Sequence, residues 1–190
     1  MRHGIASIVL AGGLAVWSAA QAAEPFTLTS PAYQDNAVLD VKHAGNAKEV
    51  ASCVGEAGNL SPPLSWANPP GTTKSFALTV VDPEGFGGAG FVHLVAYGIP
   101  ASVTGFAEGE LTEPSDKFTG GKNSPGLTTY FGPCPPAGVG AHHYTLILIA
   151  TDLDPKDPAL KPGMTRDELL AALKGHVKGT AGLILRFKHP

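Results

Sequence analysis

Three continuous apolar runs constrain this chain more than any other feature of its sequence. They cover residues 75–82, 91–97 and 144–151, and each is apolar at both odd and even positions. Because side chains alternate between the two faces of a sheet, such a run predicts a strand that is covered on both faces and lies centrally. The 24 glycines and 17 prolines indicate many turns between short strands, which favours a mostly β protein.

The rest of the chain predicts two further strands and one helix. Residues 26–30 are typical of a first strand, and residues 181–187 of a last one. The segment TRDE at 165–168 has the pattern of a capping box, in which Thr165 caps a helix and Glu168 reaches back to it. The apolar face expected for this helix holds Leu169, Leu170, Leu173 and Val177.

The N-terminal segment has the pattern of a secretory signal peptide. A basic start at Arg2 and His3 precedes an almost wholly apolar run at 5–17, and small residues follow at 20–22. The run is shorter than the about 20 residues that a membrane anchor needs. We therefore expect a signal at 1–22, cleavage after Ala22 or Ala23, a single exported domain at 23–190, and a periplasmic location. An ordinary N-terminal helix is the alternative.

Charge and cysteine content limit the possible functions. The formal net charge of −3 gives no reason to expect a nucleic acid partner. Cys53 and Cys134 form no C-x-x-C pair, which argues against a redox or metal motif. In the oxidising compartment that export implies, an even pair of cysteines predicts one disulfide, with two buried thiols as the alternative.

Candidate chemistry gathers around the ends of the three apolar runs. Asp82 closes the first run, His93 lies inside the second, and His142 precedes the third, with Tyr144 two residues later on the same face. A stiff segment, GPCPP at 132–136, comes shortly before His142. Each feature also has a plain structural interpretation, as a turn aspartate, a core histidine, a surface histidine pair or a loop brace.

Five segments in order resemble the phosphatidylethanolamine-binding protein family, in particular its bacterial branch named Raf-kinase-inhibitor-like. They are SPPLSW at 61–66, VVDPEG at 80–85, FVHLVAYGIP at 91–100, GPCPP at 132–136 and HHY at 142–144. The resemblance covers nearly the whole chain after the signal. It implies two antiparallel β-sheets with Greek-key connections and a C-terminal helix.

The resemblance also implies a pocket that binds small anions or a phospholipid head group, without catalytic residues, metal or cofactor. Cys53 and Cys134 would meet in that arrangement and hold the pocket loop. The residues that it assigns to ligand binding are Asp82, Glu84, Phe91, His93, Cys134, Pro135, Pro136, His142 and Tyr144.

The chemistry of these residues fits a zwitterion such as phosphoethanolamine. Protonated or suitably tautomeric His93 and His142 would donate to the anion, as would backbone N–H groups in the Gly/Pro loop. Asp82 would orient a histidine or meet an ammonium group. Anion binding should therefore strengthen towards about pH 5.5. Three departures from the family pattern bear on ligand preference: Glu84 stands where Asp is usual, His143 where Arg is common, and the connection at 85–90 is short.

Two other functions remain open at this stage. One is inhibition or regulation of another protein, which rests on the branch name alone because an exported protein does not meet cytosolic kinases. The other is a metal-dependent enzyme that uses Asp82, His93 and His142, since two histidines and a carboxylate can bind Zn²⁺. No metal-ligand motif or nucleophile elbow accompanies these residues, so we expect a binding protein that is not an enzyme.

Overall fold

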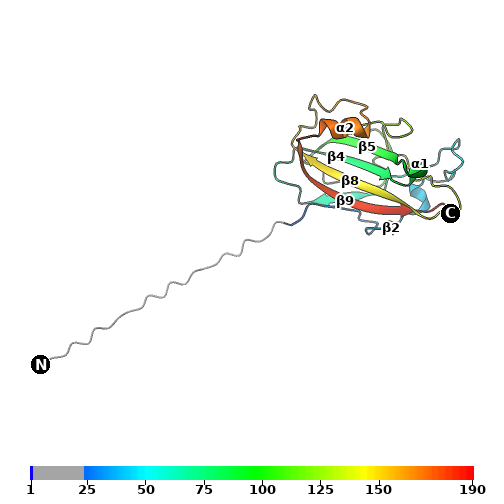
Figure 1. Ribbon diagram of the computed structural model, residues 1–190, viewed down its shortest axis with the longest axis horizontal. Coiled ribbons are helices and arrows are strands. Elements are labelled where there is room, and N and C mark those ends of the chain that lie inside the picture. Colours follow the sequence, from blue (N-terminus) through cyan, green and yellow to red (C-terminus); the bar gives the residue numbers. More distant parts are fainter. Residues whose placement is uncertain (2–23) are drawn as a thin grey trace.

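The computed structural model describes Met1 and residues 24–190, which form two packed sheets and a helix (Figure 1). The predicted signal peptide and its cleavage position lie outside the described residues. The elements are, in order, β1 (Thr27–Thr29), β2 (Ala37–Val38), a 3-10 helix (Val41–His43), β3 (Leu64–Ala67), β4 (Ser75–Asp82), α1 (Gly85–Gly88), β5 (Phe91–Pro100), β6 (Gly105–Phe106), β7 (Thr119–Gly120), β8 (His142–Thr151), α2 (Arg166–Ala172) and β9 (Val177–Phe187).

The strands form one sheet in the order β1-β3-β6 and a larger sheet in the order β2-β9-β8-β4-β5-β7. The three apolar runs become β4, β5 and β8, all interior strands of the larger sheet, as predicted. The strand pairs are antiparallel, as expected, with one exception. The exception is the edge strand β2, which runs parallel to β9 and pairs Val38 with Arg186.

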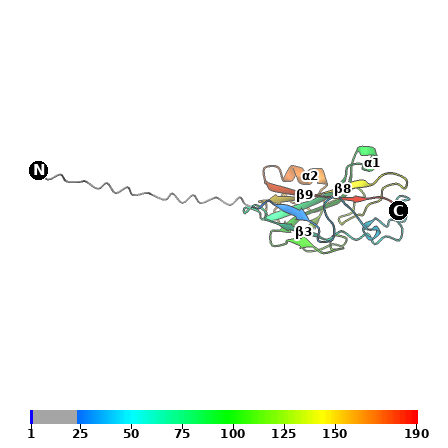
Figure 2. The same ribbon diagram turned by 90° about the horizontal axis from the view of Figure 1, so that it is seen from below.

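Two hydrophobic cores explain why the central strands are apolar on both faces. On β4, Phe76, Leu78 and Val80 belong to the core between the two sheets, whereas Ala77 belongs to a second core. The second core also holds Leu169 of α2, which covers the outer face of the larger sheet. Figure 2 shows α2 on one side of this sheet and β3 on the other. The mostly β fold with a short helix near the C-terminus is confirmed.

The predicted helix is real but shorter than its apolar pattern indicated. Thr165 accepts a hydrogen bond from the Glu168 backbone N–H, and the capping box is complete. However, α2 ends at Ala172, and Val177 is the first residue of β9 rather than part of a helix face. Gly175 has a φ of 86°, a left-handed turn that stops the helix. Among the described residues, no helix has the length and hydrophobicity to cross a membrane.

The second apolar run extends further than predicted, to Pro100 instead of Tyr97. The register between β4 and β5 shifts near Gly98, which has a φ of 62°. A Cβ on Gly98 would lie 2.5 Å from the carbonyl oxygen of Pro155. The glycine therefore allows a bulge within β5 instead of ending it.

Candidate functional site

A cavity of about 840 Å³ lies where β4 ends and β8 begins. In the antiparallel pairing, Val81 of β4 is opposite Thr145 of β8, which places Asp82 close to His142. Asp82 in turn pairs with Phe91 of β5. The predicted site residues that line this cavity are Asp82, Glu84, Phe91, His93, Cys134, Pro135, Pro136 and His142.

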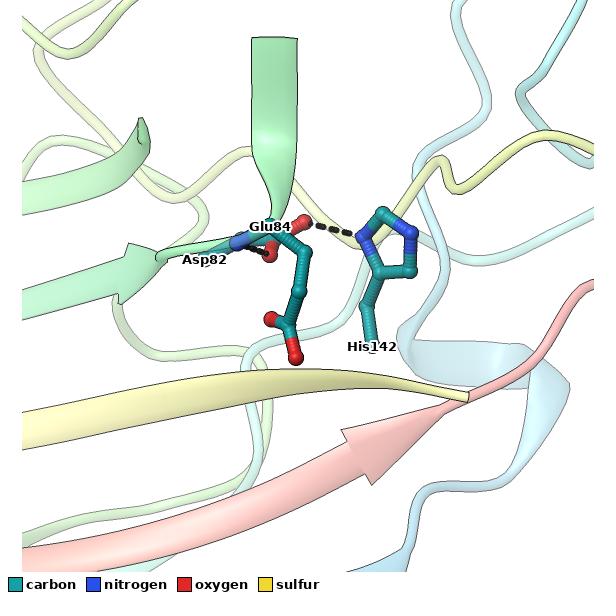
Figure 3. Close-up of side chains that lie close together, drawn as sticks. All are labelled: Asp82, Glu84 and His142. Carbon is teal, nitrogen blue, oxygen red and sulfur yellow. Dashed lines mark hydrogen bonds and ion pairs between the residues drawn. The ribbon is translucent and has the colours of Figure 1, made fainter. Parts of the chain in front are cut away.

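Asp82 orients His142 at this cavity. The Oδ2 atom of Asp82 lies 2.7 Å from Nδ1 of His142, while Oδ1 accepts hydrogen bonds from the backbone N–H groups of Glu84 (2.9 Å) and Gly85 (3.1 Å) (Figure 3). The carboxylate of Asp82 accepts the hydrogen bond from Nδ1 of His142. The other ring nitrogen, Nε2, has no hydrogen-bond partner among the described residues. The ring thus has one fixed nitrogen and one that is available to a ligand.

The pKa values of the two carboxylates of the cavity are shifted in opposite directions. Burial raises the pKa of Asp82, although the hydrogen bond from His142 acts in the opposite direction. Partial burial would also raise the pKa of Glu84, but hydrogen bonds from the side chain and backbone of His143 lower it to about 2. Glu84 therefore carries a fixed negative charge beside the cavity across the physiological pH range.

His93 lines the cavity as a buried and uncharged ring. It is 3% exposed, and its ring packs against Phe91 (4.6 Å between centroids) and Tyr144 (5.0 Å). Burial lowers the pKa of His93 to about 4, so the ring is neutral near pH 7. Because the carbonyl oxygen of Phe131, 2.6 Å from Nδ1, can only accept, Nδ1 carries the proton and Nε2 is an acceptor. His93 is therefore not a cationic donor.

The structure does not bring Tyr144 to the cavity wall. Tyr144 is 2% exposed and belongs to the core between the sheets, behind the ring of His93. Its hydroxyl has no hydrogen-bond partner among the described residues. The prediction that Tyr144 lines the site is wrong because β8 points this side chain inward, towards the second sheet.

The predicted disulfide is confirmed, and it lies at the cavity. Cys53 and Cys134 are joined across 81 residues of sequence, and Cys134 lines the cavity with Pro135 and Pro136. Gly45 packs directly on the bridge, since a Cβ there would lie 2.4 Å from the Sγ atom of Cys134. The bridge therefore ties the proline loop to the segment before β3.

Sequence reasoning predicted Phe91, Pro135 and Pro136 but missed the exposed apolar residues of the cavity wall. These are Val50, Phe86, Leu127 and Val139, which lie in four connections without periodic patterns. The connection at 85–90, expected to be short, contains the short helix α1 and holds Phe86 at a φ of 49°. The three glycines that surround Phe86 were the available signal, because a glycine-flanked aromatic in a short turn is exposed.

Potential metal ligands form a different set from the predicted one. Asp82, Glu84 and His142 place one ligand atom each within 4.8 Å of one another, and His93 is not in this group. His93 instead uses Nδ1 for the carbonyl of Phe131.

A smaller cavity of about 390 Å³ lies near β7 and holds no ionisable side chain among its lining residues.

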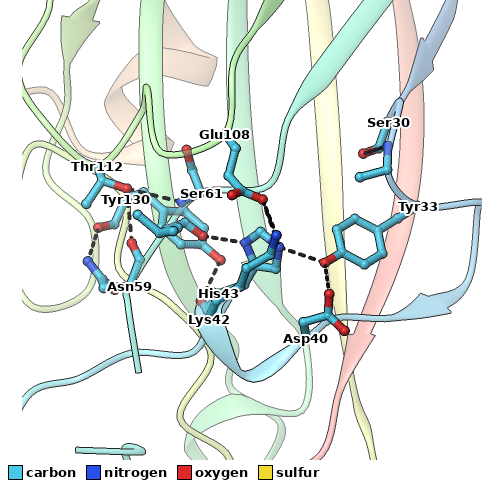
Figure 4. A network of polar contacts seen from close by, with 12 residues as sticks. Ser30, Tyr33, Asp40, Lys42, His43, Asn59, Ser61, Glu108, Thr112 and Tyr130 are labelled. Atoms are coloured by element: carbon cyan, nitrogen blue, oxygen red, sulfur yellow. Dashed lines mark hydrogen bonds and ion pairs between the residues drawn. The ribbon is translucent and has the colours of Figure 1, made fainter. Parts of the chain in front are cut away.

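A second polar cluster surrounds His43 (Figure 4), and none of its labelled residues lines the cavity. His43 is fully buried, with Nδ1 2.7 Å from the carbonyl oxygen of Leu60 and Nε2 2.8 Å from the hydroxyl of Tyr33. That hydroxyl also lies 2.8 Å from Oδ2 of Asp40. Burial lowers the pKa of His43, and both of its ring nitrogens have protein partners. This cluster braces the fold and offers nothing to a ligand.

The fold and cavity define a β-sandwich with a ligand pocket at the end of its central strands. The sequence profile described as phosphatidylethanolamine-binding protein matches residues 29–188. The chain belongs to the phosphatidylethanolamine-binding protein family. It is 36% identical over 169 residues to LppC of Mycobacterium tuberculosis, which is named a lipoprotein, covering 89% of this chain and 75% of the relative.

Other relatives and solved structures agree with this assignment. A protein named UPF0098 from Methanothermobacter thermautotrophicus is 39% identical over 135 residues, which cover 70% of this chain and 84% of the relative. The crystal structure of Escherichia coli YbcL has a TM-score of 0.74 at 29% identity and covers 86% of this chain and 98% of its own. The homologue CT736 of Chlamydia trachomatis has a TM-score of 0.71 at 27% identity, covering 87% and 98%.

Proposed function

We propose that this chain is an exported binding protein for a small anion or a phospholipid head group such as phosphoethanolamine, and that it performs no turnover. The observation that carries the proposal is the free Nε2 of His142, held towards the cavity by the hydrogen bond between Nδ1 and Asp82. A histidine fixed in this way can take up a proton and donate it as a hydrogen bond to an anionic oxygen.

The charge of the cavity favours a zwitterion over a simple anion. Its lining residues include two carboxylates, Asp82 and Glu84, and no lysine or arginine. Glu84 stays ionised because its pKa is about 2. An inorganic phosphate would face this charge without a permanent cation, whereas phosphoethanolamine brings an ammonium group that Glu84 can pair with while its phosphate contacts His142.

The cavity is also larger than an isolated phosphate requires. Its volume of about 840 Å³ lies in the upper part of the range of roughly 300–1,000 Å³ that is typical of sites for drug-sized ligands. A water molecule occupies about 30 Å³ of liquid, so a single small anion would leave most of the cavity to solvent. The size supports a head group with further atoms attached.

Isothermal titration tests this proposal directly. Phosphate, phosphoethanolamine and lysophosphatidylethanolamine are titrated into the wild type, His142→Ala and His176→Ala. His176 is a matched control, because its Nδ1 lies 2.8 Å from Oδ1 of Asp152 in a similar pair outside the cavity. We expect His142→Ala to lose about tenfold or more in affinity, the loss of one charge-assisted hydrogen bond. Equal affinity in all three proteins would refute the pocket assignment.

Export has three supports. The N-terminal sequence has the pattern of a signal peptide, and the relative LppC is named a lipoprotein. The disulfide between Cys53 and Cys134 is also typical of proteins outside the reducing cytosol. Cell fractionation with N-terminal sequencing of the periplasmic protein is the test, and an intact N-terminus in the cytosolic fraction would contradict export.

Metal binding is a second candidate, supported by the grouping of Asp82, Glu84 and His142 within 4.8 Å. Against it, both oxygens of Asp82 already accept hydrogen bonds, from His142 and from two backbone N–H groups. A metal would have to replace at least one of these bonds. Native mass spectrometry after dialysis separates the two candidates, since stoichiometric zinc that Asp82→Asn abolishes would favour the metal.

A further inference from the structure

Four exposed apolar side chains surround the mouth of the cavity. Val50, Phe86, Leu127 and Val139, here called the rim, are 41%, 71%, 47% and 38% exposed and all line the cavity. Residues 24–190 contain nine large apolar side chains that are exposed, so nearly half of them gather at this one opening. Scattered single residues of this kind are ordinary, but a concentrated patch marks an interaction surface.

Phe86 is held outward at an energetic cost. Its φ of 49° and ψ of 42° are left-handed, a conformation that a bulky residue rarely adopts. Its ring contacts Phe91, with 5.1 Å between centroids, but remains largely in solvent. Strained backbone of this kind persists where the surrounding structure imposes it and gathers at binding sites. The short helix α1 thus presents an aromatic ring that the fold itself does not use.

The loops that carry the rim hold few charged residues. They are residues 47–54, 85–90, 123–128 and 134–141, and their charged residues are Lys48 and Glu49, which have opposite signs. Glu84, directly before residues 85–90, adds one negative charge at the cavity. A surface with this balance of charge has no attraction for an anionic partner such as nucleic acid or an acidic lipid layer. The rim therefore suits a membrane whose head groups are zwitterionic and whose interior is apolar.

We propose that the rim docks on a zwitterionic phospholipid membrane, with the mouth of the cavity facing the head-group layer. The choice of a membrane as the partner rests on the head-group pocket proposed above, because docking then brings the cavity to the level of its ligand. Aromatic and aliphatic side chains at this depth lie at the boundary between head groups and acyl chains. The disulfide joins the loops at 47–54 and 134–141. Val50 and Val139 would therefore insert into the membrane surface together.

Cosedimentation with vesicles of phosphatidylcholine and phosphatidylethanolamine tests the proposal. The rim variant is Phe86→Ser with Leu127→Ser, and the matched control is Val177→Ser with Ile184→Ser, two residues of β9 that are 46% and 37% exposed. We expect the rim variant to lose on the order of tenfold or more in partitioning, from the lost apolar area, and the control to match the wild type. Both carry the same N-terminal segment, so its contribution is common to both.

Three results would overturn the membrane proposal. One is equal sedimentation of the rim variant and the control, and another is wild-type binding that high salt abolishes, which would indicate charge as the cause. The third is a wild-type dimer in analytical ultracentrifugation that the rim variant dissociates, which would make a second copy the partner. A second rim variant, Val50→Ser with Val139→Ser, repeats the comparison if the first fails to fold.

The two proposals fail separately. His142→Ala should lose phosphoethanolamine binding in solution and still sediment with vesicles, because His142 is not part of the rim. The rim variant should unfold at the same urea concentration as the control, which shows that it is folded. If the wild type sediments but binds no soluble head group, the pocket assignment fails while the docking surface remains. If it binds the head group but does not sediment, the docking surface fails alone.

Discussion

The clusters around His142 and His43 contain the same kinds of side chain but differ in what they leave free. In both, a histidine lies in a polar network that includes an aspartate, directly for His142 and through the Tyr33 hydroxyl for His43. The ring of His43 has protein partners at both nitrogens and is fully buried. His142 has one partner and borders a cavity of about 840 Å³.

This difference teaches that residue types do not identify a site by themselves. A histidine beside a carboxylate stabilises the fold when both nitrogens are satisfied, and it can bind a ligand when one nitrogen faces an open cavity. His93 is intermediate, because it borders the cavity but uses one nitrogen for the carbonyl of Phe131 and is neutral. Variants of the disulfide and of the three histidines should separate their structural roles from their binding roles.

The disulfide should have the largest effect, since it holds the pocket side of the molecule covalently. In the chain-entropy account, closing a loop of 81 residues stabilises the fold by about 4 kcal/mol. The variant Cys53→Ser with Cys134→Ser should therefore unfold with a free energy lower by about that amount in urea titrations. Wild type treated with reductant should behave like the variant. An unchanged unfolding midpoint would show that hydrogen bonds, without the disulfide, stabilise the part of the protein around the cavity.

His93 should make stability fall with acidity. Its folded-state pKa of about 4 is below the ordinary 6.5, so the unfolded chain binds the proton first. Its contribution is complete above pH 6.5 and falls by about 3 kcal/mol towards pH 4. Unfolding free energies across this window should fall less steeply in His93→Gln.

The difference between the wild type and His93→Gln isolates this contribution from those of neighbouring groups. The lowered pKa of His43 acts in the same direction, and the raised pKa of Asp82 acts in the opposite one. Parallel pH profiles for the two proteins would show that His93 titrates normally in the fold.

The variant His43→Leu should show that the cluster around His43 affects stability and not ligand binding. The substitution leaves the Leu60 carbonyl without its partner and removes one of the two partners of the Tyr33 hydroxyl, which should lower the free energy of unfolding by about 2 kcal/mol. Phosphoethanolamine affinity should not change. His142→Ala should show the reverse pattern, with affinity lost and stability changed by about 1 kcal/mol or less. A loss of affinity in His43→Leu would mean that the two clusters are coupled.

The smallest effect concerns the side chain at position 142 itself. His142 offers the cavity a single ring nitrogen, Nε2, because Nδ1 is paired with Asp82. The variant His142→Gln keeps a hydrogen-bond donor at this position, so its phosphoethanolamine affinity should fall by only about a few-fold, less than that of His142→Ala. Isothermal titration of the two variants measures the difference, and equal losses in both would count against a hydrogen bond from residue 142.

The sequence predicted the parts of the fold that depend on local patterns. The runs at β4, β5 and β8 and the capping box at Thr165 were readable because periodicity and capping involve neighbours in sequence. The end of α2 was misplaced, since an apolar residue at Val177 fits both a helix face and a strand. The parallel edge pairing of β2 was not predictable, because two residues carry no pattern.

The sequence predicted the polar residues of the cavity and part of its apolar wall, but not the exposed apolar rim. Asp82, His93 and His142 stand at strand ends and within strands, where their placement follows from the sheet. The protonation of His93 depends on how deeply Phe91 and Phe131 cover it, which the sequence does not contain. The rim residues come from loops far apart in sequence, and only the folded chain brings them to one opening.

The bridge between Cys53 and Cys134 also determines how the molecule would respond to a protease. It encloses the chain from β3 to β7, including the exposed residues between β6 and β7. A single cut in that segment breaks the backbone without separating the fragments, because the covalent ring still joins them. Cleaved protein would migrate as one band without reductant and as two with it, so a nicked molecule keeps both sides of its pocket together.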